Sequence, residues 1–319
     1  MARHRRTSAL IALCCAVAGA GLVGCEESSE SDAKPKASAT SASATTTSSP
    51  TTTEQADNAG AFTGTKKIDF SGLSVNVSCS GTAAEGKPVV VLLHGGGDSV
   101  EKLAEFQKSL SRQDRVCSYD RLGAGASDKP DGPQTVESTG KVLTSVIDEV
   151  AGDAPVVLAG HSLGGLIAAR YAPDHQDRVK GLVLMDATSP TQTADLTEGI
   201  PESATGMAVD LREQTLAVLK GKSPEMLVTP DAEVRPAGDI PVEVIQHGKR
   251  YLAAVPEYGP ALEKAWTEGQ RKWLGVSSNS RLSTAKKSEH YIYVDEPEVA
   301  AEAIRSVVSR AGDDSGAAN

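Results

Sequence analysis

The sequence predicts an α/β fold, in which helices flank a mostly parallel β-sheet. From Val75 onward, short apolar runs alternate with helical patterns, as expected for strands joined by crossover helices. Residues 88–93 are apolar throughout, which is typical of a strand buried on both faces. The first sixty residues lack this pattern. The chain of 319 residues is therefore expected to hold one domain of about 250 residues.

The apolar runs place the strands in order along the chain. They are expected at residues 73–78, 88–93, 116–120, 155–159, 179–185, 242–245 and 281–285. The first alternates polar and apolar residues, as an edge strand does, whereas the run at 88–93 is continuous, as expected when both faces of a strand are covered.

Amphipathic segments between these runs predict the helices. They are expected at residues 100–110, 135–150, 163–171, 262–274 and 297–309. The last helix opens with Pro297, which suits a first turn because proline has a helical φ and the missing N–H needs no partner there.

The interval 189–239 breaks the alternation. It holds helical fragments such as 208–219, separated by several prolines (Pro201, Pro224, Pro230 and Pro236). A long insertion in a compact domain is usually functional, so we expect a helical cap over the active site after the sixth strand. A disordered surface excursion is the alternative.

The N-terminus predicts export and a lipid anchor. Arginines at positions 3, 5 and 6 precede an apolar run at residues 9–23, as in a secretory signal. The run ends in Leu22-Val23-Gly24-Cys25, which resembles a bacterial lipobox. We therefore expect residues 1–24 to be a signal peptide and Cys25 to carry lipid, anchoring the protein to the outer face of the cell membrane. An ordinary secretory signal with a chance cysteine is the alternative.

Two further segments are expected to be disordered. Residues 25–60 are rich in Ser and Thr and almost free of apolar residues, which predicts a tether, and residues 313–319 form a short tail. The alternating pattern of strands and helices belongs to a domain expected at residues 61–312. The net charge of −10, with scattered Lys and Arg, argues against nucleic acid as a partner.

Five cysteines are divided between the signal and the folded domain. Cys14 and Cys15 leave with the signal and Cys25 carries lipid, so Cys79 and Cys117 remain. An even pair in an oxidising compartment suggests a disulfide, with two buried free thiols as the alternative.

The sequence Gly160-His161-Ser162-Leu163-Gly164 carries the strongest chemical signal. It fits a nucleophile elbow, in which a strand turns sharply into a helix and presents a serine. Here the motif follows an expected buried strand and opens an expected helix, which is the context it requires. Ser162 is therefore the candidate nucleophile.

A glycine-rich loop follows the strand at 88–93. Leu93-His94-Gly95-Gly96-Gly97 resembles the oxyanion loop of lipases and esterases, where a backbone N–H faces the substrate. We assign the oxyanion donors to the amides of Gly96 and Leu163, with Gly95 or Gly97 as alternatives to Gly96. His94 is expected to brace the loop rather than to transfer protons.

A serine nucleophile needs a base, and the chain has six histidines. Those at positions 4, 94, 161 and 175 lie in the signal, in backbone motifs or in a connection. His290 lies between the last expected strand and the last expected helix and is our choice for the base. His247, at the end of the preceding strand, is the alternative.

These segments together resemble the α/β-hydrolase superfamily over residues 70–310. The resemblance rests on the glycine loop, a turn at 119–127, the elbow and the histidine loop at 288–292. It implies an α/β-hydrolase fold and a reaction in which an acyl group passes to Ser162 and is then hydrolysed, without a metal or other cofactor. Asp120, in the turn, is expected to be structural.

The acid that orients the histidine departs from the superfamily's usual pattern. The usual position after the seventh strand reads Gly248-Lys249-Arg250-Tyr251 and has no carboxylate. Some members carry the acid after the sixth strand, where this chain has Asp186, and Glu257 is the alternative. Asp186 keeps the order Ser, Asp, His.

The resemblance also bears on the disulfide and on the substrate. In this fold the second strand neighbours the fourth, which implies a bond between Cys79 and Cys117. A small-molecule ester is the expected substrate, with amides, thioesters and perhydrolysis also accommodated by such sites. A surface lipoprotein that keeps the fold and only binds is the competing function, and the missing acid after the seventh strand is its main support.

Overall fold

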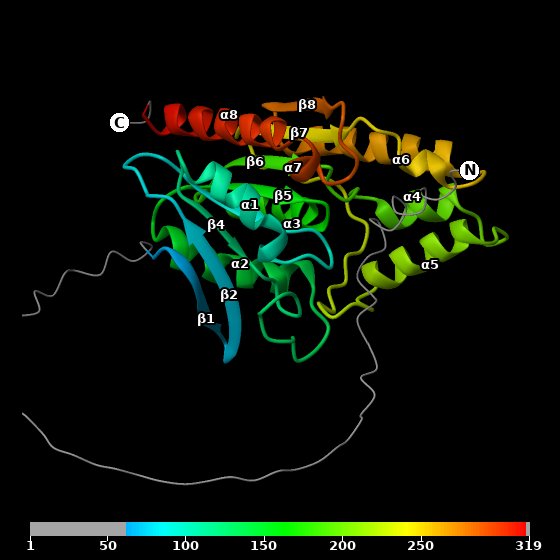
Figure 1. Cartoon of the computed structure of the whole chain (residues 1–319), viewed down its shortest axis with the longest axis horizontal. Coiled ribbons are helices and arrows are strands. Elements are labelled where there is room, and N and C mark those ends of the chain that lie inside the picture. The colour runs from blue at the N-terminus through cyan, green and yellow to red at the C-terminus, as the bar shows by residue number, and fades with distance from the viewer. Residues whose placement is uncertain (1–61, 317–319) are drawn as a thin grey trace, which may run out of the picture. The chain divides into compact units, whose positions relative to one another are not determined.

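The computed structural model describes residues 62–316, which form an eight-stranded sheet in the order β1-β2-β4-β3-β5-β6-β7-β8 (Figure 1). The strands are β1 (Gly64–Phe70), β2 (Leu73–Ser80), β3 (Val89–Leu93), β4 (Val116–Tyr119), β5 (Val156–His161), β6 (Val179–Met185), β7 (Val242–His247) and β8 (Ser280–Ala285). Strands β3 to β8 pair in parallel, and β1 and β2 are antiparallel additions at one edge. This confirms the predicted fold class.

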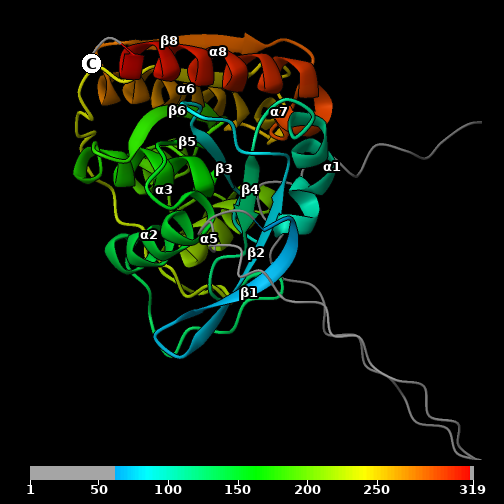
Figure 2. The same ribbon diagram turned by 90° about the vertical axis from the view of Figure 1, so that its left-hand side faces the viewer.

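Helices cover both faces of the sheet (Figure 2). They are α1 (Val100–Leu110), α2 (Val136–Ala151), α3 (Leu163–Tyr171), α4 (Gln192–Gly199), α5 (Met207–Leu219), α6 (Gly259–Lys272), α7 (Ile292–Asp295) and α8 (Pro297–Gly316), with short 3₁₀ turns between some of them. Helices α2 and α3 pack on one face, and α1, α7 and α8 pack on the other. Strand β3 is buried throughout because its alternate residues join these two cores, as its apolar sequence predicts.

Strand β1 and helix α8 differ most from the sequence prediction. Strand β1 was not expected, because most of its side chains are exposed and only Ile68 is buried. It occupies the sheet edge that was assigned to residues 73–78. Helix α8 continues to Gly316 and so includes residues 313–316 of the predicted tail. Gly312 lies within this helix, and one glycine lowers helix stability by about 1 kcal/mol without ending it.

The insertion between β6 and β7 is helical, as predicted, and contains α4 and α5. These helices share a separate apolar core with residues that follow β7. Leu196 and Leu216 come from the insertion, and Leu252 and Trp266 from the segment that ends in α6. We call residues 189–239 the cap. Figure 1 shows α4, α5 and α6 grouped beside the sheet.

A disulfide joins Cys79 to Cys117 across neighbouring strands, with the pairing that the resemblance implies. The two residues lie directly opposite each other in the antiparallel pair β2–β4. The predicted signal peptide, the lipid on Cys25 and the tether fall outside the described residues. Within residues 62–316, no helix has the length and apolar character needed to cross a membrane.

Candidate active site

Ser162 lies at a sharp turn between β5 and α3, as the elbow motif predicts. Its φ of 50° and ψ of −120° are strained for a residue with a side chain. A Cβ on Gly160 would lie 2.4 Å from the Gly164 carbonyl oxygen, and one on Gly164 would lie 2.3 Å from that of Leu93. Both positions therefore require glycine, and the turn holds Ser162 where the strand ends.

The Ser162 hydroxyl lies 3.5 Å from the hydroxyl of Thr188, which follows β6. The Thr188 amide also donates to the Ser162 carbonyl oxygen at 3.1 Å. Among residues 62–316, the serine hydroxyl makes no hydrogen bond to a histidine ring. Contacts between a nucleophile and its base are often long before substrate binds, so this geometry is compatible with a catalytic serine.

Two backbone amides near Ser162 are free to bind an anion. Neither the Gly96 N–H nor the Leu163 N–H donates to another residue in the described part of the chain. The two residues are neighbours, because a Cβ on Gly96 would lie 3.5 Å from Leu163 Cδ2. The Gly97 amide instead donates to Glu225 Oε1 at 3.3 Å, so Gly97 is a weaker choice than Gly96.

A buried ion pair between Arg121 and Glu225 supports the glycine loop at residues 94–97. The Arg121 guanidinium donates to the carbonyl oxygens of His94 and Gly95 at 2.6 and 2.8 Å, and to Glu225 Oε2 at 2.6 Å. His94 donates from Nδ1 to the Gly95 carbonyl oxygen, and its Nε2 accepts from the Arg121 amide. Burial and the charge of Arg121 lower the pKa of His94 to about 4, so the ring is neutral and structural, as expected.

Asp186 and His290 meet at the carboxyl edge of the sheet. His290 Nδ1 lies 2.8 Å from Asp186 Oδ2, and among the described residues nothing hydrogen-bonds to His290 Nε2. The Trp266 indole donates to Asp186 Oδ1 at 2.8 Å. Burial by itself would raise the pKa of Asp186, but hydrogen bonds from His247 and His290 outweigh it and hold that pKa well below its usual range. The carboxylate is therefore ionised.

The other candidates lie elsewhere. Glu257 is exposed and makes no hydrogen bond to a histidine within the described chain. Asp120 is structural, since it accepts from the Val100 and Ala126 amides and from the Asn76 side chain.

Two residues of the hydrogen-bond network around Asp186 were not predicted from the sequence. His247, considered there only as an alternative base, hydrogen-bonds through Nδ1 to Asp186 and through Nε2 to Glu263 on α6. The position of His247 could have been inferred, because β7 is the parallel neighbour of β6 and both end at the same edge. Glu263 gave no signal, since nothing in the sequence distinguishes it from Glu268, the other acidic residue of this amphipathic helix.

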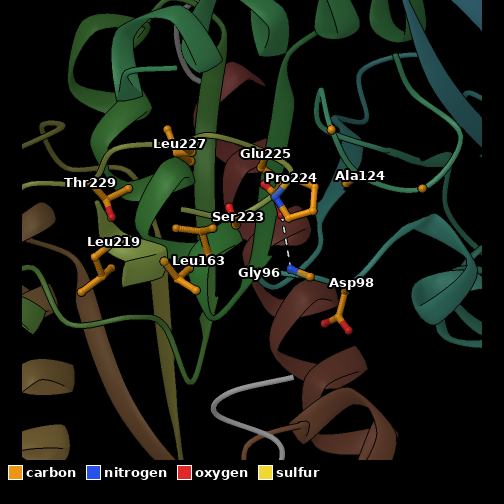
Figure 3. Close-up of a pocket in the computed structure, with 14 residues that line it drawn as sticks. Gly96, Asp98, Ala124, Leu163, Leu219, Ser223, Pro224, Glu225, Leu227 and Thr229 are labelled. Atoms are coloured by element: carbon orange, nitrogen blue, oxygen red, sulfur yellow. Dashed lines mark hydrogen bonds between the residues drawn. The ribbon is translucent and has the colours of Figure 1, made fainter. Parts of the chain in front are cut away.

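A cavity of about 140 Å³ opens beside the two free amides (Figure 3). Gly96 and Leu163 form one side, and Leu219 and Leu227 of the cap form an apolar side. Pro224 and Glu225, also from the cap, complete the wall near the glycine loop.

The fold and the site define an α/β protein with a strained serine at a strand–helix turn and a buried histidine–aspartate pair nearby. Residues 88–229 match the sequence model of the family described as alpha/beta hydrolase fold. A thermophilic esterase from Thermogutta terrifontis has the same fold, with a TM-score of 0.55 and 18% identity, covering 78% of this chain and 99% of that chain. Residues 88–229 are therefore similar in sequence to this family, and the described domain has the same fold.

Curated relatives in this superfamily include lipases, esterases and acyltransferases. The chain is 34% identical over 110 residues to a (lyso)-N-acylphosphatidylethanolamine lipase of Bos taurus, covering 33% of this chain and 32% of the relative. It is 38% identical over 116 residues to a pimeloyl-[acyl-carrier protein] methyl ester esterase of Photorhabdus laumondii, covering 36% and 41%. The matched part thus spans less than half the length of these relatives.

Proposed function

We propose that the protein is a serine hydrolase that cleaves a carboxylic ester through an acyl-enzyme on Ser162. The observation that carries the proposal is the strained Ser162 beside two unpaired amides, with the His290–Asp186 pair at the same edge of the sheet. The esterase and lipase relatives favour an ester over other acyl compounds.

In the first half-reaction, Ser162 Oγ attacks the ester carbonyl carbon while its proton passes to His290 Nε2. This requires the hydroxyl to turn from Thr188 toward His290. The amides of Gly96 and Leu163 donate to the carbonyl oxygen as it becomes negative. Asp186 keeps the proton on His290 Nδ1 and stabilises the imidazolium. The C–O bond then breaks, and His290 returns the proton to the leaving alcohol.

In the second half-reaction, water takes the place of the alcohol. His290 accepts a proton from the water, whose oxygen attacks the acyl carbon. The bond to Ser162 Oγ breaks, and His290 donates that proton back to the serine. The products are a carboxylic acid and an alcohol, and the residues return to their starting state.

A fluorophosphonate probe tests the nucleophile. We expect it to label the wild-type protein and not Ser162→Ala, while Ser309→Ala, a change on the exposed side of α8, labels normally. Equal labelling of the first variant and the wild type would reject Ser162 as the nucleophile. If Asp186→Asn retained ester turnover while Glu257→Gln abolished it, the assignment of the acid would be wrong.

We propose that the acyl group binds in the cavity beside Gly96 and Leu163, whose size favours short acyl chains (Figure 3). Its volume of about 140 Å³ is close to that of a cavity of about 150 Å³ that binds benzene, so an acyl group of about four to six carbons fits. We therefore expect kcat/KM for a series of p-nitrophenyl esters to peak at that chain length. A steady rise to twelve carbons would show that the acyl group binds elsewhere.

We also propose that the enzyme is exported and held on the outer face of the bacterial cell membrane by a lipid on Cys25. The lipobox-like residues 22–25 after a basic and apolar leader support this. Cys25→Ser, or globomycin treatment, should release the protein from membranes. Tight retention of the protein under both conditions would reject the anchor.

The competing function, a lipoprotein that only binds, drew its support from the absence of a carboxylate after β7. The contact of Asp186 with His290 argues against it, because a carboxylate that directly follows β6 can take the place of the one absent after β7.

A further inference from the structure

His247 lies between two carboxylates at the end of β7. Its Nδ1 is 3.0 Å from both oxygens of Asp186, and its Nε2 is 3.0 Å from Glu263 Oε2. The three side chains are buried, with 7%, 0% and 5% of their residues' surface exposed for His247, Asp186 and Glu263. The proposed reaction assigns no role to His247 or to Glu263.

The hydrogen bonds indicate the charge on this ring. An ionised carboxylate only accepts hydrogen bonds, and a neutral imidazole has a single N–H to donate. Asp186 is ionised, since it also accepts from the Trp266 indole, the His290 ring and the His247 amide. Donation from both ring nitrogens of His247 therefore requires an imidazolium when Glu263 is ionised as well.

Electrostatics point the same way. Burial opposes a charge on His247, but the hydrogen bonds to Asp186 and Glu263 outweigh it and raise the pKa of His247 to about 9. Tyr251 packs its ring 4.8 Å from that of His247, and burial keeps the pKa of the Tyr251 hydroxyl well above its usual value. Among the described residues, Asp186 and Glu263 hydrogen-bond to this ring and Tyr251 packs against it, so these are the titratable groups in contact with it.

We propose that His247 is a positioning residue: as a buried cation it ties the Asp186 carboxylate to Glu263, and its loss of a proton sets the alkaline limit of turnover. This inference rests on the proposed function. The usual acid position of the superfamily follows β7. In this chain the end of β7 carries the cation His247, which holds Asp186 at the end of β6. When His247 is neutral, its ring has one N–H and can donate to only one of the two carboxylates. Asp186 is then no longer fixed toward His290.

The test is the pH profile of kcat/KM for p-nitrophenyl butyrate. In the wild type we expect activity to fall above about pH 9. Glu263→Gln removes one of the two carboxylates and should move this alkaline limb down by about one pH unit or more. Glu268→Gln, an exposed change on the same helix, should leave the limb in place. In His247→Gln the side chain at this position does not titrate, so the fall in activity at alkaline pH should disappear. We expect kcat to be lowered about tenfold or more and KM to be unchanged.

A second measurement reads the charge without turnover. The ¹³Cε1 resonance of His247 should titrate near pH 9 in the wild type and at lower pH in Glu263→Gln. A midpoint at or below pH 6.5, or equal alkaline limbs in Glu263→Gln and Glu268→Gln, would overturn the inference while leaving ester turnover intact. If the wild type neither hydrolyses esters nor labels with fluorophosphonate, the proposed function fails, and the role of His247 in turnover fails with it.

Discussion

Replacing Ser162 by glycine and by alanine separates the backbone strain of this residue from the loss of its hydroxyl. Its φ of 50° and ψ of −120° disfavour any Cβ, and glycine tolerates them. Such strain costs about 1–3 kcal/mol. Replacement by glycine relieves this strain. About 0.5–1 kcal/mol of that stabilisation is lost again, because glycine gives the unfolded chain more conformational freedom. We therefore expect Ser162→Gly to be more stable than Ser162→Ala by about 1 kcal/mol.

Urea unfolding followed by circular dichroism measures this difference, since both variants lack the hydroxyl and differ only in the Cβ. Ser309, on the exposed side of α8, provides the control. There the order should reverse, with glycine less stable than alanine by about 1 kcal/mol, as in an unstrained helix. If the two positions gave the same order, the elbow would not be strained and the structural basis for a presented nucleophile would be wrong.

Three further predictions concern buried pairs. Replacing Cys79 and Cys117 by serine frees a loop of 38 residues and should lower the free energy of unfolding by about 4 kcal/mol. A decrease of less than about 1 kcal/mol, measured by urea unfolding, would contradict this. Glu225→Ala leaves the buried Arg121 cation unpaired and should cost about 3–5 kcal/mol in the same assay, whereas a wild-type midpoint would mean that water reaches Arg121. The pKa of His247 rises from 6.5 to about 9 on folding, so its contribution of about 3 kcal/mol is complete below pH 6.5 and is lost as the pH rises to about 9. Unfolding at pH 6 and pH 10 should show this loss in the wild type and not in His247→Gln, and equal losses in both would refute it.

The sheet could be predicted because most of its strands are buried on both faces. The range of β6 was predicted to the residue, and that of β3 to within one residue, from their mostly apolar sequences. Strand β1 has no such run, because it is an edge strand with Ile68 as its buried side chain. Its pairing with β2 is set by backbone hydrogen bonds, which leave no pattern in the side chains.

The site could be predicted where the chain itself brings its parts together. Ser162 and Leu163 are adjacent in sequence, and Gly96 follows a recognisable strand. Asp186 was inferred from the resemblance, because some members of the superfamily carry the acid after the sixth strand, and the contact of Asp186 with His290 agrees with that choice. Glu225 could not be found this way, because its partner Arg121 is 104 residues away and no local pattern links the two.

The two buried ionic contacts share one consequence for the cap. Glu225 lies in the cap and is paired with Arg121, which supports the glycine loop. Glu263 lies on α6, which shares the apolar core of α4 and α5, and its partner His247 also binds Asp186. Breaking either contact leaves an uncompensated buried charge, which costs several kcal/mol. Displacement of the cap helices therefore disturbs the glycine loop through one contact and Asp186 through the other. The position of the cap and the geometry of the site are thus energetically coupled.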